Sequence, residues 1–287
     1  MERNLWKQLY EVVMTTAHPG AATGVSHSDR WVVLVYLWAA VHDRSTTWAT
    51  VAEHWPDDLR PWRLPSPSAL SRRLRTGSVN ALLNALLRRS RGDPRHDWVK
   101  YLDGKPLPVG DFSKDPDARW GRGPDSFFKG YKLHAVWGTA PVPLAWEVRP
   151  ANQAEPTTAR LLVPRLGGQG YLVGDSAFDS NPLHEQAARR GHQLVAPPKK
   201  AQGAGQGHHR QSPHRLRALA LLAQPFGRAL DKTRAFVERC YGHLTSFGGG
   251  LGPLPSWVRR LHRVKRWVQA KLLINAARAS LRQPLAA

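Results

Sequence analysis

Residues 170–178 read GYLVGDSAF, a short apolar run followed by an acidic residue, Asp175. The apolar run predicts a buried strand. Residues 98–104, WVKYLDG, alternate in polarity and also end near an acid, Asp103, which predicts a second strand. Ends of neighbouring strands meet at one edge of an open α/β sheet, so Asp103 and Asp175 are expected to converge although 72 residues apart.

The segments around these two strands predict a mixed α/β sheet flanked by helices. Residues 131–138 and 142–150 have strand patterns and are separated by Thr139, Ala140 and Pro141, which suggests a hairpin. The remaining pattern predicts helices at 157–166, 182–190, 215–244 and 257–281, a strand at 192–198, and loops at 202–213 and 248–253.

The first 92 residues predict a helical region instead. Ser28 is a suitable N-cap for a helix that runs to Ala39, and Ser66-Pro67 has the pattern of an N-cap followed by a first-turn proline. Gly92-Asp93-Pro94 marks a boundary, so we expect a helical domain at 1–92 and a sheet domain at 93–287. The expected helices of the first domain are 28–39, 46–55, 68–75, which Ser66-Pro67 opens, and 80–89.

A helix, an irregular turn and a short helix faced with Ser and Arg are typical of a helix-turn-helix module. Arg72, Arg73 and Arg75 are therefore candidates for DNA contact, because arginine reaches both base edges and phosphates. A plain helical bundle with solvated arginines explains residues 28–76 almost as well, and the charge of the whole chain favours DNA.

The chain is strongly basic, with 42 Lys and Arg against 21 Asp and Glu, a formal charge of +21 and an isoelectric point of about 11.1. Such a field attracts polyanions, of which nucleic acid is the commonest in a cell. A ribosomal-type RNA binder and the arginine-rich codons of a GC-rich genome are the alternatives. Residues 199–287 hold 17 Lys and Arg but only two acids, Asp231 and Glu238, which suggests a specific role for an acid there.

Membrane and disulfide-linked classes are disfavoured. Cys240 is the single cysteine, which excludes an internal disulfide and fits a reducing cytosol. No stretch approaches the roughly 20 apolar residues of a membrane helix, and residues 1–16 lack the apolar core of a signal peptide. We expect a soluble cytoplasmic protein.

Asp103, Asp175 and Glu238 together suit a divalent metal site. Carboxylates without a His/Cys ligand spacing favour Mg²⁺ or Mn²⁺ over zinc. Two such ions about 3.5–4 Å apart activate a water or a 3′-hydroxyl and stabilise the leaving oxygen of a phosphodiester. Neighbouring acids remain as alternatives: Asp111 for Asp103, Asp179 or Glu185 for Asp175, and Asp231 for Glu238.

From about Trp98 to Ala277 the chain resembles the DDE transposases of bacterial insertion sequences. Six motifs stand in the order found in that family: YLDGKPLPV (101–109), FFKGYKLHAVWG (127–138), VRPANQAEP (148–156), GYLVGDSAFDS (170–180), LVAPPKK (194–200) and RAFVERCYGHL (234–244). The resemblance implies an RNase H-like core with Asp103, Asp175 and Glu238 as the first, second and third acids. It also implies metal-dependent hydrolysis at the ends of the element, then attack of the freed 3′-hydroxyl on target DNA.

In this family the third acid lies in a signature of Tyr, Arg, Glu and Lys at fixed intervals. Arg234 occupies the Arg position, whereas Asp231 and Thr245 stand where Tyr and Lys are expected. Tyr241 and Lys232 are the nearby candidates to replace these two groups.

The resemblance further implies double-stranded DNA partners, namely terminal inverted repeats and target DNA, at the bacterial nucleoid. Two ends imply two cooperating protomers, a homodimer. A catalytically inactive DNA-binding derivative and an RNase H-like nuclease without strand transfer are the alternatives. The closing helix, including Lys271, is expected to face DNA, and Lys132 and His134 are expected to point outward. Further DNA-contact candidates are Lys199, Lys200, Arg234, Arg239, Arg263 and Arg266.

Overall fold

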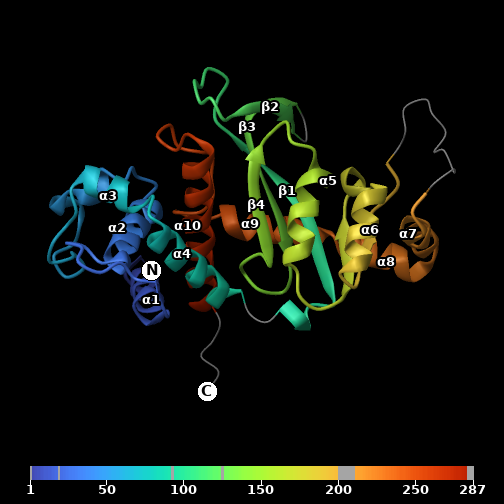
Figure 1. Ribbon diagram of the computed structural model, residues 1–287, viewed down its shortest axis with the longest axis horizontal. Helices are drawn as coiled ribbons and strands as arrows, with labels where there is room; N and C mark the ends of the chain where they lie inside the picture. Colours follow the sequence, from blue (N-terminus) through green and yellow to red (C-terminus); the bar gives the residue numbers. More distant parts are fainter. Residues whose placement is uncertain (1, 19, 92–93, 124–125, 200–210, 283–287) are drawn as a thin grey trace. The chain divides into compact units, whose positions relative to one another are not determined.

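The computed structural model describes residues 2–18, 20–91, 94–123, 126–199 and 211–282 (Figure 1). Contacts within the chain define two compact units. The helical unit comprises Met1–Gly92, His243–Val258 and His262–Ala287, and the sheet unit comprises Asp93–Gly242 and Arg259–Leu261.

A mixed sheet forms the centre of the sheet unit. Strand β3 pairs antiparallel with β1, β2 and β4, whereas β5 lies parallel to β1 and to β6. The order β4-β3-β1-β5-β6, with these directions, is that of an RNase H-like sheet, so the predicted fold class is confirmed. The strands are β1 (Val99–Pro108), β2 (Arg119–Arg122), β3 (Phe127–Trp137), β4 (Ala145–Pro150), β5 (Gly170–Gly174) and β6 (His192–Val195).

Helices cover both faces of this sheet. Successive residues of a strand point to opposite faces, so Leu172 of β5 joins a core cluster with Leu162 and Leu183, while Val173 packs with Leu230 on the other face. Burial of these side chains is the main force that holds the sheet and helices together. The helices are α5 (Glu155–Leu162), α6 (Asn181–Arg189), α7 (Pro213–Ala223), α8 (Pro225–Lys232) and the first part of α9 (Ala235–Thr245), with 3₁₀ turns η3 (Pro94–His96), η4 (Val163–Arg165) and η5 (Ser176–Phe178).

The helical unit is built around α2, most of whose residues are buried. Ser28 precedes this helix, and its side chain accepts a hydrogen bond from the Trp31 N–H, as expected of an N-cap. The elements of this unit are α1 (Glu2–Thr15), α2 (Asp29–Val41), the 3₁₀ turns η1 (Trp48–Thr50) and η2 (Ala52–His54), α3 (Pro67–Arg73), α4 (Gly77–Ser90) and α10 (Leu261–Ser280).

The helix predicted at residues 46–55 is absent from the structure of that segment, where two 3₁₀ turns stand instead. Indole N–H groups bind two backbone carbonyls of this segment. The Trp55 indole donates to the Ala49 carbonyl at 2.8 Å, and the Trp38 indole donates to the His54 carbonyl at 3.1 Å. Stacking of Trp38 on Trp55 at 4.5 Å holds this arrangement.

The closing helix α10 differs from its predicted placement. The predicted division assigns it to the sheet domain, yet nearly all of it belongs to the helical unit. Lys271, expected to face DNA, is fully buried, and its ammonium donates to Asp43 and to the carbonyls of Ala40 and Gly249 at 2.6–2.9 Å. A buried ammonium is retained where such partners satisfy it, so Lys271 serves the packing of the helical unit.

Within the described part of the chain, no helix combines the length and the apolar character required to cross a membrane.

Candidate active site

Asp103 and Asp175 lie next to each other because of the register between β1 and β5. These strands are parallel, with Leu102 opposite Gly174, and each acid is the next residue along. The structure thus brings together the two acids that the sequence predicts to converge. It corrects one detail: β1 continues to Pro108 through its pairing with β3, so Asp103 lies within a strand and only Asp175 follows the end of one.

A tight turn fixes the Asp175 side chain. Asp175 caps the 3₁₀ turn η5, and its Oδ1 accepts the Ala177 N–H at 2.8 Å. Gly174 gives the turn room, because an added Cβ would lie 3.0 Å from the ring of Phe178. Backbone N–H groups of η5 therefore orient the Asp175 carboxylate.

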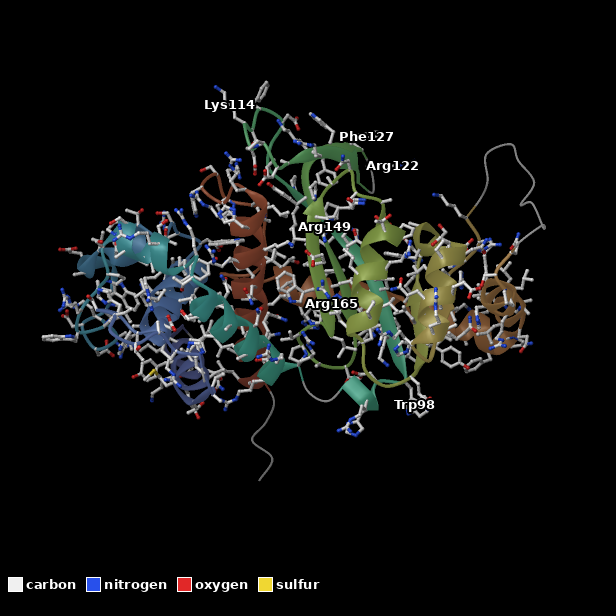
Figure 2. All side chains as sticks on the ribbon, in the orientation of Figure 1. Trp98, Lys114, Arg122, Phe127, Arg149 and Arg165 are labelled. Atoms are coloured by element: carbon white, nitrogen blue, oxygen red, sulfur yellow. The ribbon has the colours of Figure 1, made fainter. Side chains whose placement is uncertain are left out.

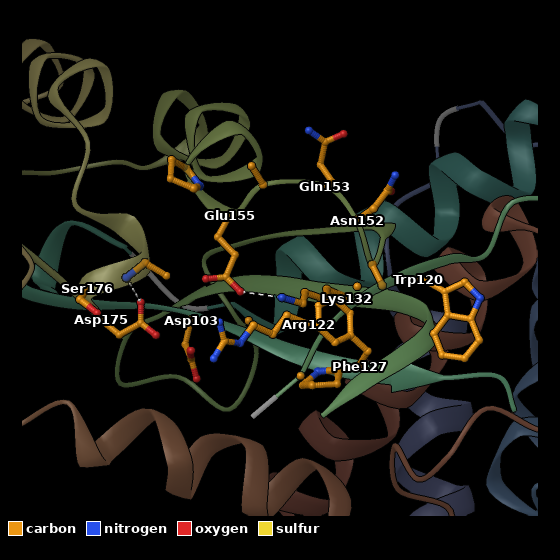
Figure 3. A pocket seen from close by; sticks show the side chains of 18 of the residues that line it. Asp103, Trp120, Arg122, Phe127, Lys132, Asn152, Gln153, Glu155, Asp175 and Ser176 are labelled. Atoms are coloured by element: carbon orange, nitrogen blue, oxygen red, sulfur yellow. Dashed lines mark hydrogen bonds and ion pairs between the residues drawn. The ribbon is translucent and has the colours of Figure 1, made fainter. Parts of the chain in front are cut away.

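Both acids line a pocket of about 870 Å³ in the sheet unit (Figure 3). Glu155, the first residue of α5, points into the same pocket and accepts a hydrogen bond from Lys132 at 2.9 Å. Lys132 was expected to point outward with His134, but its side chain is only 12% exposed and His134 is fully buried. The expectation of an outward polar pair is therefore wrong, because α5 covers this face of β3.

The rim of the pocket is aromatic and basic. Trp120 and Arg122 come from β2 and Phe127 from the start of β3, with Trp120 52% and Phe127 69% exposed. Figure 2 shows Arg122 and Phe127 at the same end of the sheet. Lys199, a predicted phosphate contact, also lines the pocket. Carboxylates inside and cations and rings at the rim suit a polyanionic chain that is held close to bound cations.

The acids of the pocket repel one another. Burial raises the pKa of Asp103 to about 6; the charges of Asp175 and Glu155 also raise it, whereas the Gly104 N–H and Arg234 oppose the shift. Burial and the charge of Glu155 likewise raise the pKa of Asp175. A cation bound among these groups would relieve the repulsion and keep them ionised.

The raised pKa of Asp103 leads to a stability prediction for Asp103→Asn in metal-free buffer. The folded-state pKa of about 6 lies above the ordinary value of 3.8, so the folded protein binds the proton more tightly and stability falls as pH rises between these values. Asparagine removes this loss, and the free energy of unfolding at pH 7.5 should rise by on the order of 2 kcal/mol.

Urea unfolding from pH 4 to pH 8 with a chelator measures this effect. The advantage of Asp103→Asn should grow up to about pH 6 and then level off. The exposed Asp111→Asn serves as the control and should leave stability unchanged. If Asp103→Asn is less stable than wild type at pH 7.5, ionisation of Asp103 does not destabilise the folded protein.

Glu238 lies on α9, which packs against β1 beside the pocket. The Tyr241 hydroxyl donates to the Asp103 carbonyl at 3.1 Å, and the charge of Arg234 acts on both Asp103 and Asp175. In the sequence, Glu238 lies four residues after Arg234 and three residues before Tyr241. Its own side chain is exposed and does not line the pocket. Among the described residues, no three His, Cys, Asp or Glu side chains converge closely enough to hold a metal ion.

The alternative acids lie elsewhere. Asp179 is almost fully buried in an ion pair with Arg215, and Glu185 accepts a hydrogen bond from Ser212. Asp111 is exposed and, like Asp231, does not line the pocket. Asp103 and Asp175 are therefore the two candidates that the structure brings together.

The residues predicted to contact DNA differ in the contacts that they make within the protein. Arg73 donates to the buried carboxylate of Asp29 at 2.5 Å, so it stabilises the helical unit and is not available to DNA. Arg72 and Arg75 are exposed on and after α3, and Arg239 packs over the Phe236 ring at 5.7 Å. Lys200 lies outside the described residues. Arg263 and Arg266 line a second pocket, in the helical unit.

Sequence reasoning missed Glu155, Arg122 and Trp120. Glu155 is the next-to-last residue of the motif VRPANQAEP, and its place before Pro156 at a helix start is the signal that was available. The strand that carries Arg122 and Trp120, RWGR, is too short and too polar to stand out from a loop.

Residues 94–267 match the family model of the transposase DDE domain. No curated protein sequence matches the chain. Among solved structures, a cryo-EM structure of the piggyBac transposase synaptic complex with hairpin DNA is similar, with a TM-score of 0.45, 10% sequence identity, and coverage of 96% of this chain and 70% of that chain. The family model spans more than half of the chain. The chain therefore belongs to the transposase DDE domain family.

Proposed function

We propose that the chain is an active transposase that cuts DNA at the ends of its element and joins the freed 3′-hydroxyl to target DNA. The adjacency of Asp103 and Asp175 on parallel strands, in a chain of the DDE family, carries this proposal. Its site of action would be the bacterial nucleoid, and its two DNA ends would require two protomers.

The residues fit a site for Mg²⁺ or Mn²⁺. Asp103 and Asp175 supply carboxylate oxygens, which hard cations prefer, and burial together with the charge of Glu155 raises the pKa of both acids, a shift that a bound cation would oppose. Two bound ions would activate the attacking water or 3′-hydroxyl and stabilise the leaving oxygen. Glu238 is the proposed third ligand, because the same segment of the chain supplies Arg234, whose charge acts on both acids, and Tyr241, whose hydroxyl donates to the Asp103 carbonyl.

Other residues of the site would position DNA. Lys199 at the pocket and Arg122 at its rim would neutralise phosphates next to the reacting one. Trp120 and Phe127 present exposed rings that suit contact with bases or sugars of an opened DNA end. The net charge of +21 supports double-stranded DNA as the partner.

The experiment is a cleavage and joining assay on a plasmid that carries the gene's own flanking DNA. With Mg²⁺ or Mn²⁺ we expect nicks at the flanks and joined products with a target plasmid, and neither with a chelator. Cleavage without preference for the flanks and without joined products would instead identify a nuclease. Binding of the flanking DNA without metal-dependent cleavage would identify an inactive DNA-binding derivative.

A further inference from the structure

A second pocket, of about 300 Å³, lies entirely within the helical unit. It is formed by Tyr36 of α2, the segment 44–47 that follows this helix, Arg75 after α3, and the first turns of α10. These segments are far apart in the sequence, so the pocket exists only in the folded unit.

The pocket is strongly cationic. Among the described residues that line it are four arginines and a histidine, and none of the lining residues is acidic. Hydroxyl groups, such as that of Ser71, stand among the arginines and supply further hydrogen-bond donors. Arg75 also donates to Ser71 at 3.0 Å, which places its guanidinium at this wall. Several cationic donors with no carboxylate among the described lining residues favour an anionic ligand.

Arg266 is the residue that most needs such a ligand. Its Nε is buried and has no hydrogen-bond partner among the described residues. Burial lowers the pKa of its guanidinium, and the charges of Arg263 and Arg75 lower it further, against an opposing effect of Tyr36. Isolated buried charges are costly, and an anion in the pocket would remove that cost.

Other shielded arginines of the chain show the contrast. Arg73 pairs with Asp29 at 2.5 Å and Arg215 pairs with Asp179 at 2.7 Å. For Arg266 no described carboxylate takes this role, and the neighbouring charges are those of two more arginines. None of the described residues that line the pocket supplies a counter-charge, which leaves this role to a bound anion.

We propose that the pocket binds one backbone phosphate of DNA, with Arg266 at its base and Arg75 and Arg263 beside it. A phosphate matches the planar donor fork of guanidinium groups. The pocket volume exceeds that of one phosphate, and the indole of Trp257, which is 41% exposed, offers a wall for the attached sugar. That the phosphate belongs to DNA rests on the proposed function, whereas anion binding by the pocket does not.

Inorganic phosphate is the first probe, used with the full-length protein. Phosphate should raise the melting temperature of wild type above that in chloride at equal ionic strength, because a ligand that binds only the folded state stabilises it. Arg266→Gln and Arg75→Gln should lose this response. The exposed Arg88→Gln, in the same unit but outside the pocket, should keep it. An equal response in all four proteins would refute the assignment of the pocket as an anion-binding site.

The salt dependence of DNA binding is the second measurement. Arg75→Gln and Arg266→Gln should each reduce the slope of log affinity against log salt by about one unit, as loss of one phosphate contact does. Arg75 is exposed, so its variant keeps the test valid if Arg266→Gln fails to fold. Unchanged slopes together with a lost phosphate response would mean that the pocket takes only free phosphate, which overturns the DNA assignment.

The two proposals fail separately. Asp103→Asn should keep both the phosphate response and the slope while it loses cleavage. If the wild-type protein cleaves DNA but its melting temperature does not respond to phosphate, this inference is refuted and the proposed function is not. A responsive pocket in a wild-type protein without metal-dependent cleavage supports the inference as anion binding and refutes the proposed function.

Discussion

Asp103→Ala and Asp175→Ala are each expected to lower metal-dependent DNA cleavage by about a thousandfold or more, because each removes a carboxylate that would hold the metal ions. The two acids are adjacent in the register of β1 and β5, so loss of either should disrupt the same site. Initial rates of plasmid nicking with saturating Mn²⁺ measure the effect. Retained binding of the flanking DNA by both variants would assign the loss to chemistry.

Asp231→Ala is the matched control, an acid on α8 that lies outside the pocket. It should cleave at close to the wild-type rate. Equal rates in wild type and both pocket variants would refute the assignment of Asp103 and Asp175.

The third ligand is decided by comparing Glu238→Gln with Glu155→Gln. Loss of cleavage as complete as in Asp103→Ala is expected for Glu238→Gln, and a smaller loss for Glu155→Gln, whose carboxylate already pairs with Lys132 at 2.9 Å. The reverse order would assign the third ligand to Glu155, which lines the pocket with the two aspartates.

Asp179→Ala is expected to lower the free energy of unfolding of the sheet unit by about 3–5 kcal/mol, as removal of one partner from a buried ion pair does. Arg215 donates to both oxygens of Asp179 at 2.7 Å, and the Lys199 N–H donates to one of them at 3.0 Å. The alanine would leave the Arg215 guanidinium buried without its counter-charge. Urea unfolding at pH 7 measures the loss.

An exposed ion pair provides the control for this experiment. Asp57 is 93% exposed and faces Arg60 at 3.4 Å, so Asp57→Ala should change stability by less than about 1 kcal/mol. A loss at Asp179 no larger than at Asp57 would contradict the structural role.

The pH dependence follows from the same contacts. His184 and Arg215 hold the pKa of Asp179 well below its ordinary value, although burial alone would raise it. Its stabilising effect is therefore complete above the ordinary pKa of 3.8 and is lost as pH falls further. Wild type and Asp179→Ala should accordingly differ most above about pH 4 and converge in stronger acid.

Local sequence patterns predict the sheet well because strand signals are local. The apolar run at 170–174 and the alternation before Asp103 are properties of neighbouring residues, and the hairpin at 131–150 is a contact between adjacent segments. Short or atypical elements escape this reasoning. The strand β2 has only four residues, and it exists because it pairs with β3.

The sequence by itself determined the fold class, the positions of every described strand except β2, and the pair Asp103 and Asp175, because alternation, apolar runs and the acids that accompany them are encoded within a few residues. Only the tertiary structure decided which charged residues are partners. Lys271 meets Asp43 across 228 residues of sequence and Arg73 meets Asp29 across 44. A local pattern shows such a residue as one more surface charge, since its burial and its partner arise only when distant segments pack together.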